Sequence, residues 1–315
     1  MEKTITKYKI LILGGGGYIG SNLSLSLKNA GHNVFAMARP GFIPRQNYED
    51  SMLLYNDFKD TTSLGRILKD RQIDIVIHLI SSLIPGSDTT SYVESIAADI
   101  LPTIKLLDIM PAAGVNKIIF FSTGGAIYGH NGKTYNSELD PTNPLNYYGL
   151  QKLIIEKNIL MSHRRHGLEY LILRPSNVYG KKVITGGNQG LIGVILGKIV
   201  RKEDVEVWGN GDIVRDYLYI DDCCRAVNDL IESGKWNEIV NVGSGIGATV
   251  NDIIGLVKEI SGVNFRVNYS TGRKEDVPTN ILNTDKLKGM IAWNNLIFPR
   301  RGIELSWNYA KRHEL

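Results

Sequence analysis

A run of glycines between an apolar stretch and a helix-like stretch constrains this chain more than any other feature. Residues 8–13 (YKILIL) have the pattern of a short buried strand, and residues 18–30 that of a helix. Between them, Gly14, Gly17 and Gly20 give G-x-x-G-x-x-G. At such a junction, glycines let the backbone turn sharply and approach a pyrophosphate, while the helix N-terminus supplies N–H donors. The pattern predicts a dinucleotide-binding loop, and the alternative is a flexible glycine-rich turn.

The first half of the chain alternates between strand-like and helix-like stretches. The strands are apolar at nearly every position, which indicates burial on both faces, as in a parallel sheet covered by helices. The alternation predicts the α/β class, with a doubly wound parallel sheet of the Rossmann type. The further expected strands are residues 34–38, 53–58, 73–80, 117–122 and 168–173, and the expected helices are 61–71, 91–113 and 147–166.

The pattern loosens after residue 180, where short strands mix with helices and with clusters of Gly and Asn. We therefore predict a dinucleotide-binding domain over residues 1–180, to which some later segments return, and a smaller mixed α/β substrate lobe over residues 181–315. Expected strands in the lobe are 205–208, 239–242 and 265–269, and expected helices are 191–201, 221–233 and 250–260.

Composition and charge exclude several classes of protein. The net charge is +4, and no run of Lys or Arg suggests a nucleic-acid-binding surface. Cys223 and Cys224 are the only cysteines, and adjacent cysteines favour neither a disulfide nor a metal site. No apolar run has the length of a membrane span, and the start lacks a signal-peptide pattern. We therefore expect a cytoplasmic protein without metal, nucleic acid or membrane partners.

The end of the second strand bears on the choice of dinucleotide. Dinucleotide folds usually place an acidic residue there to bind the adenosine ribose, but this chain has Ala38 followed by Arg39. The missing carboxylate and the added guanidinium favour a 2′-phosphate, and hence NADP over NAD. The alternative is that Arg39 stacks on adenine and NAD still binds. Asp57 ends the third strand and is either an adenine contact or a turn residue.

Tyr148 and Lys152 are the candidate catalytic pair. They stand at i and i+4 of an expected helix and so point the same way. A phenol with an ordinary pKa of about 10 is a poor base at neutral pH. A nearby ammonium and a bound nicotinamide cation would lower the pKa of Tyr148 and make it an acid/base. Tyr147 has Gln151 rather than a cation at i+4, so Tyr148 is the better candidate.

Hydroxyl groups follow the expected strand 117–122, in the segment 121–129 (FSTGGAIYG). The carboxyl ends of strands are where doubly wound folds bind ligands. Ser122 or Thr123 could hydrogen-bond a substrate oxygen while Tyr148 takes or gives its proton. The alternative is a simple turn with capping hydroxyls.

Taken together, these motifs resemble the extended short-chain dehydrogenase/reductase family, in its nucleotide-sugar epimerase/dehydratase branch. The resemblance rests on the glycine loop, the Ser/Thr strand end, Y-x-x-x-K at 148–152 and LRPSNVYG at 173–180. It continues through residues 207–211 (VWGNG), 215–222 (RDYLYIDD), 241–245 (NVGSG) and 273–278 (RKEDVP), and so spans about residues 7–307.

The resemblance implies roles for the matching residues. Tyr148 would be the acid/base and Lys152 its electrostatic partner, which also holds the nicotinamide ribose. Arg215 and Arg273 would clamp the sugar diphosphate, since a guanidinium fork suits phosphate; surface ion pairing is their alternative. Further cofactor contacts would come from Tyr18, Ile19, Phe58, Leu79, Ser81 and Pro175, and further substrate contacts from Ser82 and Asn177.

The chain departs from the family pattern in ways that affect chemistry. Gly124 stands where the family has its catalytic Ser or Thr, so Thr123, Ser122 or a serine of the pair 81–82 must replace it. The family's frequent Asn in the helix after the fourth strand is Asp99 here. The dehydratases carry an Asp-Glu pair after the strand-end Thr, whereas this chain has Gly124-Gly125, which disfavours dehydration.

The expected chemistry is hydride transfer at C4 of a nucleoside-diphosphate sugar. A 4-epimerase would return the hydride to the opposite face of the sugar, whereas a reductase of a 4-keto-6-deoxyhexose would consume NADPH. A non-enzymatic NADP sensor is a third reading, which the presence of both Tyr148 and Lys152 opposes. The family also implies a homodimer formed through helices 91–113 and 147–166, and a role in surface-polysaccharide biosynthesis.

Overall fold

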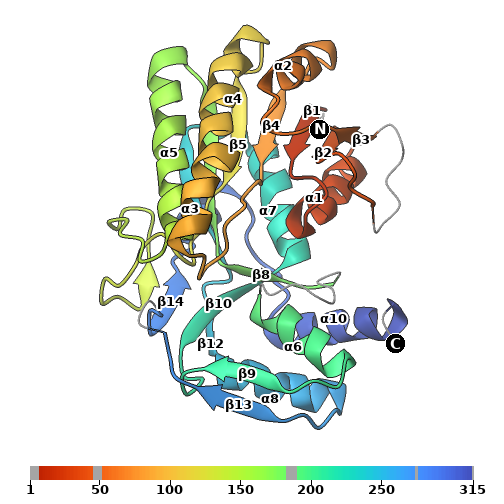
Figure 1. The fold of residues 1–315 in the computed structure, drawn as a ribbon, viewed down its shortest axis with the longest axis vertical. Helices are drawn as coiled ribbons and strands as arrows, with labels where there is room; N and C mark the ends of the chain where they lie inside the picture. The colour runs from red at the N-terminus through yellow and green to blue at the C-terminus, as the bar shows by residue number, and fades with distance from the viewer. Residues whose placement is uncertain (1–6, 45–51, 182–189, 274–275, 314–315) are drawn as a thin grey trace.

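Seven parallel strands form the larger sheet of the protein, in the order β11-β7-β5-β4-β1-β2-β3. The computed structural model describes residues 7–44, 52–181, 190–273 and 276–313 (Figure 1). The order reverses at β1, the sign of a doubly wound sheet, and this confirms the predicted fold class. The strands are β1 (Lys9–Leu13), β2 (Asn33–Ala38), β3 (Leu53–Tyr55), β4 (Ile75–His78), β5 (Lys117–Phe121), β7 (Glu169–Pro175) and β11 (Glu238–Val242).

Helices cover both faces of this sheet. In β5, Ile118 and Phe120 pack on one face against α2 (Thr61–Asp70), α4 (Leu101–Ala112) and α5 (Tyr147–His166), while Ile119 and Phe121 lie in the buried cluster on the other. That second cluster includes residues of α1 (Tyr18–Asn29) and α7 (Ile220–Ser233) and continues into the lower lobe. Because the strands are buried on both faces, their sequences are apolar at most positions rather than alternating.

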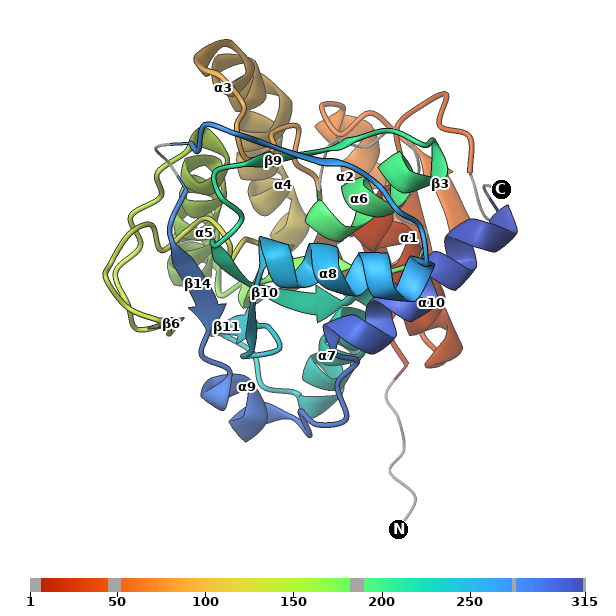
Figure 2. The same cartoon turned by 90° about the horizontal axis from the view of Figure 1, so that it is seen from below.

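The second lobe lies below the carboxyl ends of the large sheet (Figures 1 and 2). Its central strand, β10, pairs with an antiparallel β12 and with parallel β14 and β8. A separate pair of parallel strands, β9 and β13, runs along its outer side. The elements are β8 (Asn177–Tyr179), β9 (Val205–Trp208), β10 (Val214–Tyr219), β12 (Gly247–Thr249), β13 (Val267–Ser270), β14 (Thr279–Leu282), α6 (Leu191–Val200), α8 (Val250–Ser261), α9 (Asp285–Met290) and α10 (Pro299–His313).

The chain crosses between the two sheets several times. β6 (Tyr135–Asn136) and β8 precede residue 180 but pair with β14 and β10 of the second lobe. β11 follows residue 180 and returns to the large sheet beside β7. The expected boundary at residue 180 therefore divides the chain in sequence but not in space. Each sheet contains strands from both sides of it.

The helix expected over residues 91–113 is interrupted. The structure has α3 (Thr89–Ser95), a π-helical turn (Ile96–Ile100) and then α4, which begins beside Pro102. Proline lacks an N–H and cannot make the regular helical bond at that point. π-Helical turns are often found at functional sites, and this one contains Asp99, whose side chain is buried. No helix in the described part of the chain is both long and apolar enough to cross a membrane.

Candidate active site

The glycine loop has the tight backbone that the sequence predicts. Gly14 has a φ of 83°, a conformation that favours glycine, and its carbonyl oxygen accepts the N–H of Gly17 at 3.0 Å. A Cβ on Gly20 would lie 2.3 Å from that same oxygen. Only a glycine at position 20 therefore lets α1 pack this close to the loop.

One cavity of about 1040 Å³ joins the loop to the lower lobe. It runs from the first turn of α1, past the carboxyl ends of β4, β5 and β7, to β10. Two lobes that meet across such a cavity can enclose a dinucleotide and a second ligand together. The predicted site residues that line it are Gly14, Gly17, Tyr18, Ile19, Gly20, Arg39, Leu79, Ser81, Ser122, Thr123, Tyr148, Lys152, Pro175, Asn177 and Arg215.

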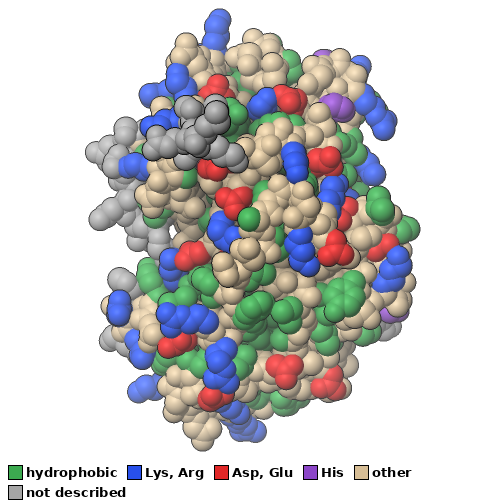
Figure 3. All heavy atoms as spheres, turned by 180° about the vertical axis from the view of Figure 1, so that it is seen from behind, with side chains coloured by type: hydrophobic (Ala, Val, Ile, Leu, Met, Phe, Trp, Pro, Cys, Tyr) green, Lys and Arg blue, Asp and Glu red, His purple; other side chains and the backbone are tan. Residues whose placement is uncertain are grey.

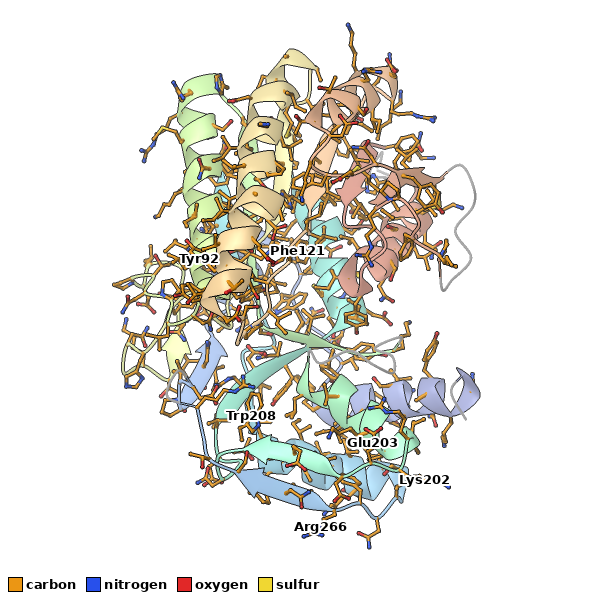
Figure 4. The ribbon with its side chains drawn as sticks, in the orientation of Figure 1. Tyr92, Phe121, Lys202, Glu203, Trp208 and Arg266 are labelled. Atoms are coloured by element: carbon orange, nitrogen blue, oxygen red, sulfur yellow. The ribbon has the colours of Figure 1, made fainter. Side chains whose placement is uncertain are left out.

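The start of α5 turns its two tyrosines in different directions. Asn146 caps the helix by accepting the N–H of Gly149 at 2.8 Å. Tyr147 stacks on Tyr92 of α3, which Figure 4 labels, with ring centroids 4.6 Å apart, and it is not among the cavity-lining residues. Tyr148 lines the cavity. Of the two tyrosines, only Tyr148 is therefore placed where it could reach a ligand in the cavity.

Lys152 lies beneath Tyr148 and is almost completely buried. Its ammonium donates a 2.9 Å hydrogen bond to the carbonyl oxygen of Phe121, at the lower end of β5 where Figure 4 labels that residue. Burial lowers the pKa of Lys152 to about 8, and the charge of Asp99 opposes that fall. The side chain therefore carries its positive charge at neutral pH and can lose it in mildly alkaline solution.

Tyr148 does not have the lowered pKa that the sequence led us to expect from Lys152. Burial raises the pKa of its phenol, and a hydrogen bond with the Thr123 side chain partly offsets that rise. The Lys152 ammonium lies 5.9 Å from the centroid of the Tyr148 ring and bonds to Phe121 instead. A lowered pKa at Tyr148 would therefore need the charge of an oxidised nicotinamide in the cavity.

The structure separates the two candidate helper hydroxyls. The Thr123 side chain is close enough to Tyr148 to lower the pKa of its phenol, whereas the buried Oγ of Ser122 has no hydrogen-bond partner among the described residues. Gly124, the family's usual hydroxyl position, is crowded, since a Cβ there would lie 2.6 Å from a methyl group of Leu282 and 2.9 Å from the backbone oxygen of Arg174. A side chain at position 124 would therefore clash with β14, which explains why this chain has a glycine where the family has a hydroxyl.

Next to the Tyr148–Lys152 pair, a buried network of hydrogen bonds joins Asp99 to Ser82 and Gln151. The Asp99 carboxylate accepts hydrogen bonds from the N–H and hydroxyl of Ser82, both at 2.7 Å, and from Gln151 at 3.0 Å. The hydroxyl of Ser81 donates to the side-chain oxygen of Gln151 at 3.2 Å. Ser82 is therefore turned toward Asp99, and unlike Ser81 it is not among the cavity-lining residues.

The predicted diphosphate contacts fall in two places. Asn177 and Arg215 line the cavity, and Arg215 is held by the carbonyl oxygen of Val277 at 2.6 Å and lies 3.8 Å from Asp276. Arg273 is not among the lining residues; its guanidinium lies over the ring of Trp208, which Figure 4 labels in the second lobe. Lys274 and Glu275, which belong to the same motif, lie outside the described residues.

Of the residues expected to contact the adenosine of the cofactor, only some line the cavity. Arg39 is exposed and lines the cavity. Asp57 accepts the N–H of Lys59 at 3.0 Å, which makes it a turn residue. Phe58 packs in the core against the edge of His78. Neither Asp57 nor Phe58 is among the cavity-lining residues, so the structure does not bring their side chains to the site.

Some lining residues were not predicted from the sequence. Asn146 could have been found, because an Asn directly before a helix marks a cap next to the Tyr148 pair. Phe42 and Ile43 follow β2 and border the glycine loop, and Tyr309 comes from α10 at the far end of the chain. Nothing local in the sequence indicates that these three residues share one cavity.

In the described part of the chain, no three His, Cys, Asp or Glu side chains gather in a way that could hold a metal ion. On the face shown in Figure 3, acidic and basic side chains are mixed rather than gathered by sign.

The fold and site define a class: a nicotinamide-dinucleotide-dependent enzyme in which a tyrosine and a lysine lie between a glycine loop and a second ligand site. The family model "NAD dependent epimerase/dehydratase family" matches residues 10–243. The chain belongs to that family.

Individual relatives are similar over nearly their whole length. A UDP-glucose 4-epimerase of Halalkalibacterium halodurans is 28% identical, covering 96% of each chain. The crystal structure of Thermotoga maritima UDP-glucose 4-epimerase with UDP-glucose has a TM-score of 0.89 at 31% identity, covering 96% of this chain and 99% of that one. The Thermus thermophilus UDP-glucose 4-epimerase complex with NAD has a TM-score of 0.88 at 25% identity, covering 98% and 100%.

Proposed function

We propose that this enzyme is an NAD-dependent 4-epimerase of UDP-linked sugars. The observation that carries the proposal is the single cavity that contains the glycine loop, the Tyr148–Thr123 pair and the side chains of Asn177 and Arg215. A dinucleotide and a sugar diphosphate placed at its two ends would meet at Tyr148. The names of the similar 4-epimerases support UDP as the nucleotide.

The residues suggest a division of labour. Tyr148 removes the proton from the C4 hydroxyl and later returns it, while Thr123 orients its phenol. Lys152, held by the Phe121 carbonyl, keeps a positive charge beneath Tyr148. Arg215 and Asn177 bind the diphosphate while the oxidised sugar turns to present its other face. When bound, the dinucleotide supplies the acceptor and donor of hydride.

NAD rather than NADP is the cofactor in this proposal. The family description and the NAD-bound neighbour support NAD, and neither supports the preference for NADP drawn from Ala38 and Arg39. Arg39 is exposed, so it is free to stack on an adenine without a 2′-phosphate. Binding of NAD and NADP to cofactor-stripped protein, followed by fluorescence, tests this choice; tighter binding of NADP would contradict it.

A 4-keto-sugar reductase is the second candidate, because the Ala38-Arg39 pair would suit a consumed NADPH. One assay distinguishes the two functions. Conversion of UDP-glucose or UDP-GlcNAc without net change in cofactor supports the epimerase. Stoichiometric loss of NADPH with a dTDP-4-keto-6-deoxyhexose, and none with UDP-sugars, would support the reductase. Cofactor binding without turnover of any nucleotide sugar would favour the sensor.

We also propose that the protein is a homodimer. Val93, Ile96 and Leu101 of the α3–α4 segment and Met161 of α5 are exposed apolar side chains on the helices that the family resemblance assigns to pairing. Burying them against a second copy would remove apolar surface from water. The cytoplasmic location and the part in polysaccharide biosynthesis remain predictions.

A further inference from the structure

The turn after Thr123 is held by a residue from the other lobe. Asn280, in β14, is almost fully buried, and its side-chain amide donates to the carbonyl oxygens of Gly124 at 3.1 Å and Gly125 at 3.0 Å. Its own side-chain oxygen accepts from Asn136 at 3.2 Å. Both N–H groups of the amide are thus used on one turn, which lies 155 residues earlier in the chain.

The turn has few other means of keeping its shape. Gly124 and Gly125 have no side chains to pack, and the N–H of Gly124 bonds to the carbonyl oxygen of Pro175 at 2.8 Å. Pro175 therefore fixes the turn from the large sheet, and Asn280 fixes it from the second lobe. Because the turn directly follows Thr123, both contacts bear on where the Thr123 hydroxyl lies.

The same strand also reaches the other end of the cavity. In the register of β10 and β14, Asn280 is the partner of Arg215, which lines the cavity. One pair of strand residues thus connects the predicted diphosphate end to the turn that carries the helper hydroxyl.

We propose that Asn280 is a positioning residue for proton transfer: it holds the Gly124–Gly125 turn so that the Thr123 hydroxyl stays beside the Tyr148 phenol, with which it lines the cavity. It touches neither reacting atom itself and acts through Thr123. The inference rests on the proposed function for its kinetic consequence, but the geometry that it describes does not depend on which sugar is bound.

The test is a double-mutant cycle between Asn280→Ala and Thr123→Ala. A misplaced catalytic group costs about 10- to 100-fold, so Asn280→Ala should lower kcat by about that factor with little change in KM. In the Thr123→Ala background, the same change should cost less than about twofold, because the residue through which it acts is gone. Asn280→Asp, which keeps the shape but loses the donors when ionised, should resemble Asn280→Ala above the pKa of the new carboxyl group.

Asn283→Ala is the matched control. Asn283 follows β14, and its side chain bonds to Asp285 rather than to the turn. This variant should keep the kcat of the parent protein. Its melting temperature, compared with that of Asn280→Ala, shows how much of any loss in activity reflects unfolding.

A readout without substrate separates this inference from the proposed function. The pKa of Tyr148 can be followed by ultraviolet absorbance of the phenolate, with Tyr148→Phe as the reference. Asn280→Ala should raise this pKa, because the Thr123 hydrogen bond that lowers it is lost. An unchanged Tyr148 titration, or equal losses of kcat in both backgrounds, would overturn the positioning role. A parent protein inactive on all nucleotide sugars would refute the function, while the titration still decides the inference.

Discussion

The carbonyl oxygen of Phe121, at the end of β5, accepts a 2.9 Å hydrogen bond from the buried ammonium of Lys152 on α5. The bond joins the strand that precedes the helper hydroxyl to the helix that carries Tyr148. Among the described residues no carboxylate bonds directly to this buried cation, and burial lowers its pKa.

Replacing Tyr148 by Phe should remove the acid/base while leaving the cavity intact. General acid–base catalysis contributes about 10²- to 10⁴-fold, so kcat for UDP-glucose should fall by at least the lower figure. NAD binding, measured by fluorescence, should stay within about threefold, because the phenyl ring retains the packing. A variant that kept a tenth of the turnover would show that the acid/base lies elsewhere.

The two candidate hydroxyls should differ in their effect on turnover. Thr123→Ala removes the side chain that lowers the pKa of Tyr148 and should lower kcat by about 10- to 100-fold. Ser122→Ala removes a hydroxyl with no partner among the described residues, so the expected loss is less than about threefold. The reverse order of effects would identify Ser122 as the helper.

The alkaline limit of activity should depend on Asp99. The ammonium of Lys152 is present below its pKa of about 8 and is lost as the pH rises through that value, so kcat/KM should decline there. The Asp99 carboxylate raises the pKa of Lys152. Asp99→Asn should therefore move the decline to lower pH. Buried His78, with a pKa lowered to about 3, stays neutral throughout this range.

Asp108→Asn is the control for this charge change. Asp108 is an exposed carboxylate on α4, so its removal is screened by water and should leave the pH profile in place. Equal shifts in both variants would mean that net charge, rather than the buried carboxylate, sets the limit.

Two glycine-to-alanine changes should have opposite effects on stability. In Gly20→Ala, the new methyl group would lie 2.3 Å from the Gly14 oxygen, and we expect a loss of about 2 kcal/mol in the free energy of unfolding and weaker NAD binding. In Gly255→Ala, on α8, the methyl group meets nothing within 4 Å, and the helix should gain about 1 kcal/mol. Denaturant unfolding and NAD titration measure both.

A charge on the exposed face of α4 should break the proposed dimer. Leu101 is 49% exposed, and Leu101→Glu would place a carboxylate in an interface that covers it. Light scattering should then give the mass of one chain, whereas the parent gives that of two. Leu139 is 96% exposed and lies outside these helices, so Leu139→Glu should leave the dimer unchanged. A parent protein with the mass of one chain would rule out the dimer.

Local patterns in the sequence predicted the elements that hold the cofactor half. Apolar strands, the spacing of Gly14, Gly17 and Gly20, and the i, i+4 pair of Tyr148 and Lys152 are properties of short segments. Such patterns can be recognised without knowledge of the rest of the fold. The doubly wound sheet follows from their alternation, since parallel strands need covering helices on both faces.

The π-helical turn and the strands of the second lobe were harder to predict from the sequence. The helix pattern over residues 91–113 is continuous in the sequence, and the register shift at Ile96–Ile100 becomes visible only when Asp99 is seen to meet Ser82 and Gln151. β6 and β14 are short and polar in part, and each is stabilised by a strand distant in the chain. No local periodicity marks such strands.

By itself, the sequence determined the class of fold, the glycine loop and the pairing of Tyr148 with Lys152, because each depends on residues within one or two turns of chain. Only the tertiary structure decided which hydroxyl meets Tyr148 and why Gly124 cannot carry one. That choice depends on Leu282 and Asn280, which reach the turn from more than 150 residues away. Such long-range contacts depend on how the two lobes pack against each other. No pattern in a short stretch of sequence indicates how two lobes will pack.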